Sequence, residues 1–280
     1  MNMKSRNSIH RLIVVTSIFI FSAGLLAQQN QNNKGFVPEV GQQGKDVVWV
    51  PTPQELVDTM LSIAHVTPGD FVMDLGSGDG RTVITAAKLG AHALGIEFNP
   101  DMVALSRRNA EIAGVTGKAE FIQGDLYEQD LSKATVITMF LLPEINLKLR
   151  PRLLNLKPGT RIVSNTFTMG EWEPDKEVNT DENWNSWNTA LLWIVPAKVE
   201  GKWKIGKGEL SLTQEFQFIH GAMKINGKES SISDGRLYGE EITFTIGDDL
   251  YNGIVNGSRI TGTVTNKSSK SDWTATRSGS

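Results

Sequence analysis

Between residues 50 and 197, short apolar runs alternate with stretches whose apolar residues recur every three or four positions. The short runs are typical of buried parallel strands, and the longer stretches are typical of amphipathic helices. This alternation predicts an α/β fold built on a doubly wound parallel sheet. The expected strands cover residues 71–74, 93–98, 119–123, 134–140, 161–167 and 189–196, and the expected helices cover residues 53–64, 81–89, 99–113 and 145–156.

From about residue 199 the pattern changes to short segments in which apolar and polar residues alternate. Asn-Gly pairs at residues 226–227 and 256–257 are strong signals for tight hairpin turns. We therefore expect residues 198–280 to form a separate antiparallel β domain, curled into a small sandwich or an open barrel. It contains no cluster of catalytic residue types, so partner binding, substrate presentation and stabilisation are all open roles for it.

The start of the chain has the pattern of a targeting segment. Lys4, Arg6 and Arg11 precede a largely apolar run over residues 12–27, which ends at the small residue Ala27. This is typical of a signal peptide, and the run is shorter than the ~20 apolar residues of a spanning helix. We expect residues 1–27 to be a signal peptide, or alternatively a retained membrane anchor, with the remainder exported to the periplasm. Residues 28–48 are polar and predict a linker, which leaves residues 49–197 as the first folded domain.

Composition and charge exclude several kinds of site. The chain has no cysteine, and therefore neither disulfides nor a thiolate nucleophile or metal ligand. Its four histidines lie far apart without ligand spacing, so we expect no metal site. The formal net charge of -3 gives no broad basic region and argues against a nucleic-acid partner.

A glycine-rich turn follows the first strand of the doubly wound sheet. Gly76, Gly78 and Gly80 tolerate positive φ and leave room for a ligand at the main chain. Dinucleotide enzymes favour G-x-G-x-x-G, whereas the spacing here is G-x-G-x-G, with Asp74 two residues before the first glycine. A carboxylate at this place can receive an ammonium while N–H groups at the helix start receive a carboxylate. The turn therefore fits a ligand with an amino-acid end, such as S-adenosylmethionine.

Two further acids follow the next two strands. Glu97 lies about twenty residues after the glycine turn, where an acid binds ribose hydroxyls in doubly wound sheets. NAD would use the same carboxylate, so Glu97 alone indicates a nucleoside. Asp125 follows the third strand, and the carboxyl ends of parallel strands meet at one edge of a sheet. The glycine spacing and the third acid favour S-adenosylmethionine over NAD.

These motifs resemble those of the class I S-adenosylmethionine-dependent methyltransferases. Residues from about 50 to 174, under half of the chain, further resemble the small protein-lysine methyltransferases that act on mitochondrial inner-membrane proteins, together with their bacterial relatives. The matching residues are Trp49-Val50-Pro51, residues 74–81, Glu97-Phe98-Asn99-Pro100, Ser106-Arg107, Gly124-Asp125-Leu126, Val163-Ser164-Asn165-Thr166-Phe167 and Trp172-Glu173-Pro174.

The resemblance implies a Rossmann-like sheet of seven strands and N-methylation of a protein lysine by in-line transfer, on a substrate that can be membrane-associated. In this reading Asp74 holds the cofactor's ammonium, Glu97 its ribose and Asp125 its adenine amino group. The implied cofactor-binding set is Asp74, Gly76, Ser77, Gly78, Gly80, Glu97, Phe98, Asp125 and Leu126.

The acceptor amine needs a desolvated, partly apolar pocket, because burial favours its neutral form. Candidates for that pocket are Trp49, Phe140, Asn165 and Trp172, and no general base is assigned. The fourth strand leads into Leu141-Leu142-Pro143 in place of the Asn/Asp-Pro-Pro-aromatic motif of many amino methyltransferases. This difference argues against methylation of DNA base amino groups.

Two other functions are compatible with these patterns. One is a non-catalytic S-adenosylmethionine or nucleoside binder of the cell envelope, whose β domain binds a partner. One reason for this alternative is the absence of the Asn/Asp-Pro-Pro-aromatic motif. The other is that S-adenosylmethionine is made in the cytosol, whereas this chain is expected to be exported. The other is an NAD-linked oxidoreductase, which the glycine spacing and Asp125 disfavour.

Overall fold

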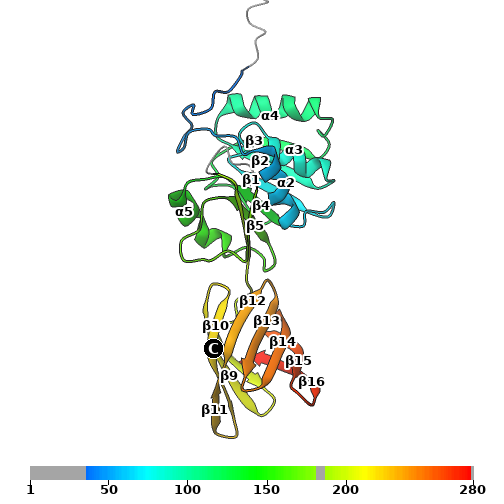
Figure 1. The fold of residues 1–280 in the computed structure, drawn as a ribbon, viewed down its shortest axis with the longest axis vertical. Helices are drawn as coiled ribbons and strands as arrows, with labels where there is room; N and C mark the ends of the chain where they lie inside the picture. Colours follow the sequence, from blue (N-terminus) through cyan, green and yellow to red (C-terminus); the bar gives the residue numbers. More distant parts are fainter. Residues whose placement is uncertain (1–35, 181–186, 279–280) are drawn as a thin grey trace, which may run out of the picture. The chain divides into compact units, whose positions relative to one another are not determined.

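The computed structural model describes residues 36–180 and 187–278. The chain divides into two compact units, Met1–Pro38 and Glu39–Ser280. The second unit contains an α/β domain followed in sequence by an all-β domain (Figure 1). The signal peptide or anchor expected at residues 1–27 lies outside the described residues, and within these no helix is long and apolar enough to cross a membrane.

The α/β domain is organised around a seven-stranded sheet in the order β3-β2-β1-β4-β5-β7-β6, which confirms the Rossmann-like doubly wound fold. Strands β1 to β5 are parallel, and β7 is antiparallel to both of its neighbours. The chain builds outward from β1 to β3 and then returns to place β4 beside β1. This reversal opens a crevice at the carboxyl ends of the strands, where such folds bind ligands. The strands are β1 (Phe71–Leu75), β2 (His92–Glu97), β3 (Ala119–Gln123), β4 (Val136–Met139), β5 (Arg161–Asn165), β6 (Lys176–Asn179) and β7 (Thr189–Ile194).

Alternate residues of the central strands belong to two different hydrophobic cores, one on each face of the sheet. Val72 and Val136 pack in the core that contains buried residues of α2, α3 and α4. Met73 and Ile137 pack in the core that contains buried residues of α5. Because strands are buried on both faces, they are apolar almost throughout, as the sequence pattern indicated. The helices are α2 (Gln54–Ile63), α3 (Arg81–Lys88), α4 (Pro100–Ile112) and α5 (Pro143–Leu153).

Two segments differ from the sequence-based predictions. The edge strand β6 covers residues 176–179, where no strand was expected, and in it Val178 alone packs against a core. Edge strands bury few side chains and therefore give a weak hydrophobic signal. Residues 39–48, expected to belong to a linker, are part of the second compact unit. There they form a hairpin, described below with the site.

The C-terminal domain confirms the predicted antiparallel β architecture and is a closed barrel, neither a sandwich nor an open one. Nine strands form one sheet, which closes because β8 pairs with both β9 and β16 while β9 pairs with β10. Strand β11 pairs with β10 outside this ring. The strands are β8 (Gly201–Ile205), β9 (Gly208–Glu215), β10 (Phe218–Ile225), β11 (Lys228–Ser231), β12 (Ser233–Tyr238), β13 (Glu241–Ile246), β14 (Asp249–Asn256), β15 (Arg259–Thr265) and β16 (Lys270–Arg277).

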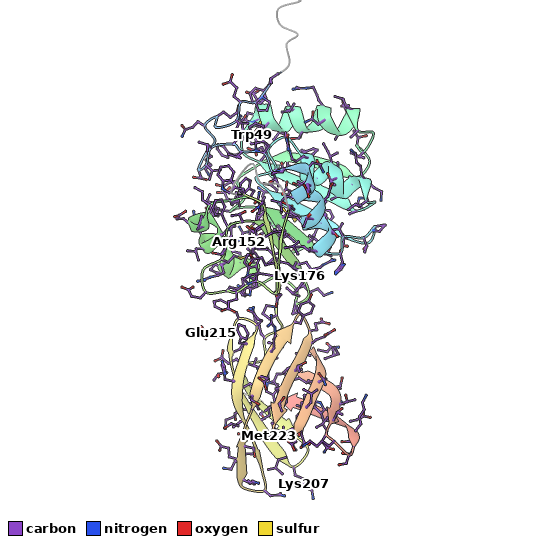
Figure 2. The ribbon with its side chains drawn as sticks, viewed as in Figure 1. Trp49, Arg152, Lys176, Lys207, Glu215 and Met223 are labelled. Carbon is purple, nitrogen blue, oxygen red and sulfur yellow. The ribbon has the colours of Figure 1, made fainter. Side chains whose placement is uncertain are left out.

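Side chains fill the interior of the barrel. Trp203, Phe244 and Met223 are each at most 4% exposed (Met223 is labelled in Figure 2). The buried indole of Trp203 donates to the carbonyl of Val199 at 2.8 Å, which satisfies its polar atom. A ring of about eight strands has an interior that side chains can fill. The barrel therefore has an ordinary packed core.

The barrel follows β7 and contacts the α/β domain near the amino ends of the parallel strands. Ile194, at the end of β7, lies beside Arg161, the first residue of β5. The Ile194 N–H donates to the Asp175 carboxylate, which also pairs with Arg236 of the barrel at 2.9 Å. The barrel therefore lies away from the carboxyl edge of the sheet, where the predicted site residues lie.

Candidate active site

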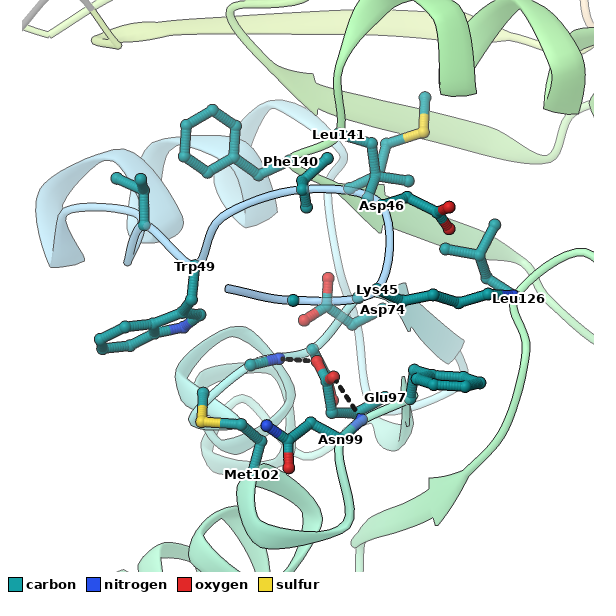
Figure 3. Close-up of a pocket in the computed structure, with 18 of the residues that line it drawn as sticks. Lys45, Asp46, Trp49, Asp74, Glu97, Asn99, Met102, Leu126, Phe140 and Leu141 are labelled. Carbon is teal, nitrogen blue, oxygen red and sulfur yellow. Dashed lines mark hydrogen bonds between the residues drawn. The ribbon is translucent and has the colours of Figure 1, made fainter. Parts of the chain in front are cut away.

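A cavity of about 240 Å³ lies at the carboxyl edge of the seven-stranded sheet (Figure 3). The ends of β1, β2, β3 and β4 contribute to its lining, together with residues 42–52. Most of the predicted site residues meet there, although they come from separate parts of the chain. Those that line the cavity are Trp49, Asp74, Gly76, Ser77, Gly78, Glu97, Phe98, Asp125, Leu126 and Phe140.

The three glycines of the turn all have left-handed backbone conformations, and they serve different purposes. At Gly78, with φ +53°, a Cβ atom would lie 2.6 Å from the Trp49 indole nitrogen, so only glycine lets this ring cover the turn. At Gly80 a Cβ atom would lie 2.7 Å from the ring of Phe121 on β3. Gly80 does not line the cavity, and its expected part in shaping the cofactor site stays a prediction. It permits close packing of α3 against the sheet.

The backbone N–H groups of the turn are used inside the protein. Gly76 and Ser77 donate to the carbonyl of Ile96 at 2.9 and 3.0 Å, and Gly80 donates to the carbonyl of Ser77 at 2.9 Å. Gly78 donates to the Glu97 carboxylate at 3.0 Å. These four turn amides are therefore satisfied inside the protein, and the expectation of a ligand carboxylate at the helix start, which begins with Arg81, stays a prediction. The turn contributes shape and a close approach to the main chain.

Asp74 is a buried acid at the centre of the cavity. Its side chain is 6% exposed, and its carboxylate accepts a hydrogen bond from the Thr138 hydroxyl at 2.6 Å. Burial raises the pKa of Asp74 to about 7, and repulsion by Asp79 and Glu97 adds to the rise. A carboxyl group in this environment favours a cationic partner, which would stabilise its charged form.

Glu97, the last residue of β2, is fixed by two backbone donors. Its carboxylate oxygens accept from the N–H of Gly78 at 3.0 Å and from the N–H of Asn99 at 2.9 Å (dashed in Figure 3). These bonds hold the carboxylate between the glycine turn and the start of α4. Each carboxylate oxygen has a further lone pair, so Glu97 can accept hydrogen bonds from two neighbouring ligand hydroxyls.

Asp125, after β3, is paired with a residue that the sequence did not indicate. The Lys45 ammonium lies 2.6 Å from one carboxylate oxygen and 4.8 Å from the centre of the Phe98 ring. The other oxygen accepts from the N–H of Tyr127 at 2.9 Å. The hydrogen bond from Lys45 holds the pKa of Asp125 below its ordinary value. A lysine in a polar segment without periodicity carries no sequence signal for such a role.

Lys45 belongs to a hairpin across the cavity, residues 41–49, which we call the strap. The Gly41 N–H donates to the Trp49 carbonyl, and the Trp49 N–H donates to the Gln42 carbonyl, both at 2.9 Å. Just after the strap, the Thr52 carbonyl accepts a hydrogen bond from the guanidinium of Arg81 at 2.8 Å. This bond connects the end of the strap to α3. Trp49 and Lys45 thus cover the cavity (Figure 3); Lys45 lies in the stretch that the sequence pattern predicts as a linker, and Trp49 is the first residue of the domain predicted after it.

The four candidates for the acceptor pocket have different surroundings. Trp49 and Phe140 line the cavity. Asn165 is fully buried beside it; its amide donates to the Thr52 hydroxyl at 3.4 Å, and its oxygen has no partner within the described part of the chain. Trp172 is a core residue with 0% exposure, stacked on Phe216 at a centroid distance of 6.2 Å. The structure corrects its assignment to the acceptor pocket.

Two aromatic residues outside the predicted set also line the cavity. Phe167 follows β5, and Trp187 precedes β7. Phe167 lies within the matching segment 163–167, but a single aromatic residue at a strand end is more often part of a core. They share the cavity because the folded sheet places the end of β5 beside the start of β7.

The chemistry of the cavity fits the cofactor that the sequence indicated. A buried carboxylate with a single hydroxyl donor suits an ammonium, and two strand-end carboxylates suit hydroxyl and amino donors. The buried Ser77 hydroxyl, which also lines the cavity, has no partner in residues 36–180 or 187–278. These groups correspond to the polar parts of S-adenosylmethionine.

The sheet order, with a glycine turn and strand-end acids around one cavity, defines a class I S-adenosylmethionine-dependent methyltransferase. A relative from Saccharolobus islandicus (strain REY15A), named "Protein-lysine N-methyltransferase", is 46% identical over 152 residues, which cover 53% of this chain and 94% of that protein. The chain belongs to this family of lysine methyltransferases. The family model described as "ANTKMT methyltransferase domain" matches residues 74–176.

Two further comparisons extend this result. The "Adenine nucleotide translocase lysine N-methyltransferase" of Mus musculus is 35% identical over 142 residues, covering 49% of this chain and 62% of that protein, so this chain spans less than two thirds of its length. The crystal structure of an "RNA methyltransferase from Salinibacter ruber in complex with S-Adenosyl-L-homocysteine" is 49% identical, with a TM-score of 0.51, covering 54% of this chain and 96% of that one. S-adenosylmethionine is accordingly the cofactor.

Proposed function

We propose that this protein transfers a methyl group from S-adenosylmethionine to the side-chain amine of a protein lysine. The observation that carries the proposal is the convergence of Asp74, Glu97 and Asp125 on one cavity with an aromatic and apolar end. The acceptor class is supported by the 46% identity to a protein-lysine N-methyltransferase over nearly all of that relative's length.

In this proposal each strand-end acid holds one polar part of the cofactor. Asp74 receives the ammonium of the amino-acid end, Glu97 the ribose hydroxyls and Asp125 the adenine amino group. The glycine turn, with Gly76, Ser77 and Gly78, shapes the site for the amino-acid end. Phe98 and Leu126 line the cavity next to Glu97 and Asp125, and they flank the adenine.

When bound, S-adenosylmethionine supplies a sulfonium methyl group that an amine nitrogen takes by in-line displacement, forming a C–N bond as the C–S bond breaks. The amine must present a lone pair, so the lysine ammonium loses a proton to solvent beforehand. Apolar surroundings favour this loss because they lower the pKa of a lysine. Phe140, Leu141 and Leu142 supply such surroundings. The protein's main contribution is then alignment of the amine at near-attack distance.

A labelling experiment tests the acceptor class. The purified full chain and tritiated-methyl S-adenosylmethionine are incubated with a protein extract in one reaction and with an RNA extract in another. Both extracts come from the same cells. We expect label that protease releases as methyllysine. Label that only ribonuclease releases would contradict the proposal and support the RNA acceptor named for the Salinibacter ruber protein. Cofactor binding without any labelled product would favour the non-catalytic alternative.

We also propose that residues 1–27 direct the chain to the cell envelope and that its substrate is membrane-associated. The support is the basic start followed by the apolar run over residues 12–27. Mass spectrometry of the protein from fractionated cells should find an envelope protein that begins after Ala27, or an intact chain in the membrane fraction. An intact chain in the cytosolic fraction would contradict the proposal.

A further inference from the structure

Three aromatic rings gather at one end of the cavity, and we call them the aromatic cluster: Phe140 after β4, Phe167 after β5 and Trp187 before β7. The two phenylalanine rings are stacked, with centroids 5.8 Å apart and an interplanar angle of 17°. Trp187 lies edge-on to Phe140 at 5.8 Å and 64°. All three are half-buried and line the cavity, so part of each side chain can contact a ligand (Phe140 is labelled in Figure 3).

Phe167 reaches this position through a strained turn. Thr166 has φ +58°, and the Phe167 N–H donates to the Asn165 carbonyl at 2.6 Å, which closes a three-residue γ-turn. A left-handed conformation is a genuine outlier for a β-branched residue, with a cost that the surrounding structure must offset. Backbone strain of this kind concentrates at functional sites.

Buried polar side chains hold the strained turn. The Phe167 carbonyl accepts hydrogen bonds from the Asn146 amide at 3.2 Å and from the Ser164 hydroxyl at 2.8 Å, and both side chains have 0% exposure. The Thr166 N–H donates to the Thr189 carbonyl, at the start of β7, at 2.7 Å. The backbone at Thr166 and Phe167 is therefore held by residues of α5, β5 and β7.

The geometry of the cluster discriminates between kinds of ligand. Because the rings of Phe140 and Phe167 are already stacked on each other, a planar base has no slot between them. Their outer faces and the Trp187 ring instead offer π-electron density to a cation. The adjacent lining residues Leu141, Leu142 and Ile145 are apolar and suit a hydrocarbon stem. An aliphatic chain that ends in an amine or alkylammonium matches both features.

We propose that the aromatic cluster is the acceptor subsite and that it recognises an aliphatic ammonium by cation–π contact. The inference rests on the proposed function, since it names the groups that hold the lysine side chain. Phe140, Phe167 and Trp187 act on the amine directly, whereas Thr166 and Asn146 are positioning residues. The rings bind the cation, and the apolar lining of Leu141, Leu142 and Ile145 favours the neutral amine. The subsite therefore accepts a lysine in either protonation state.

The first test compares the methyl-transfer kinetics of the full chain with those of two single variants, Phe140→Leu and Phe167→Leu. Leucine keeps apolar volume and removes the π face, so we expect the KM for a lysine acceptor to rise about tenfold. The affinity for S-adenosylhomocysteine should stay unchanged, which also shows that the variants are folded. Phe218→Leu is the matched control, because that ring lies in the barrel under Arg236. An unchanged KM in both cavity variants would overturn the proposal.

The second test does not depend on activity. Binding to the S-adenosylhomocysteine-loaded protein is compared by NMR titration for two short peptides, one with trimethyllysine and one with its neutral isostere, in which carbon replaces the quaternary nitrogen. We expect about tenfold tighter binding of the cation, with the preference lost in Phe140→Leu and Phe167→Leu and retained in Phe218→Leu. Equal binding of the two peptides would overturn the subsite.

The two tests separate failure of the subsite from failure of the proposed function. If the wild-type chain labels no protein lysine, the proposed function fails whatever the peptides show. If lysine is labelled but the neutral isostere binds as tightly as the cation, the proposed function stands and the aromatic cluster is not a cation site.

Discussion

Changing Asp74 to asparagine separates the cost of burying a carboxylate from its use in binding. The side chain is 6% exposed, and its hydrogen-bond partner is the Thr138 hydroxyl at 2.6 Å. That hydroxyl can donate equally well to an asparagine oxygen. Asp74→Asn therefore keeps the shape of the site and removes its charge.

The effect on stability depends on pH, and its direction follows from the raised pKa. Between the ordinary value of 3.8 and the folded value of about 7, the folded protein holds a proton on Asp74 that the unfolded chain has lost. Raising the pH through this window therefore destabilises the folded state. At about 1.36 kcal/mol for each pKa unit, the full cost above pH 7 is about 4 kcal/mol. Asp74→Asn does not titrate, so its stability relative to the wild type should increase by up to about 4 kcal/mol from pH 4 to pH 8.

Urea unfolding of the ligand-free full chain, followed by tryptophan fluorescence at several pH values, measures this difference. Asp248→Asn, on an exposed turn of the barrel, is the matched control and should follow the wild type. Calorimetric titration should show that Asp74→Asn no longer binds S-adenosylmethionine. Parallel stability curves for Asp74→Asn and the wild type would refute the buried-charge reasoning. Full retention of cofactor affinity would refute the assigned role in binding.

Four further changes test other parts of the structure. Lys45→Met removes the cation from Asp125 and should speed both association and dissociation of S-adenosylmethionine in stopped-flow fluorescence; unaltered rates would mean that the strap does not restrain access to the cavity. Glu97→Ala removes two backbone hydrogen bonds and a ligand acceptor, so calorimetry should show affinity at least about tenfold weaker. Trp172→Ala should lower the free energy of unfolding by about 3–5 kcal/mol and leave the acceptor KM unchanged, whereas a raised KM would return this residue to the acceptor pocket. Arg236→Ala leaves a buried carboxylate without its cation and should cost about 1–3 kcal/mol in thermal unfolding; an unchanged Tm would show that the contact adds nothing.

The predictions that held were those that rested on local spacing. The third strand, Ala119–Gln123, has the predicted bounds, and the strand before the glycine turn, Phe71–Leu75, runs one residue past its predicted end. In the barrel, both Asn-Gly pairs lie at hairpin turns, between β10 and β11 and between β14 and β15. Residues 236–246, which alternate apolar and polar residues over most of their length, belong to two strands, β12 and β13, because the chain turns after Tyr238. The signal for that turn is Gly239, which has a left-handed conformation at φ +63° and is followed by two acidic residues.

Lys45, in the strap, shows why part of the site was beyond prediction. The polar residues of the strap have neither helical nor strand periodicity, and Lys45 reaches a carboxylate that lies 80 residues further along the chain. Similarly, nothing local distinguishes Trp172, which fills a core, from Trp187, which faces the cavity. An aromatic side chain buries itself equally well against protein or ligand.

By itself, the sequence determined the class of fold, the glycine turn and the acids at three strand ends, because each depends on residues close together in the chain. The tertiary structure alone decided that the turn's amides are satisfied internally, that a polar strap covers the cavity, and which aromatic residues surround the acceptor end. Those features depend on contacts between remote segments, which form only when the sheet brings its carboxyl ends together.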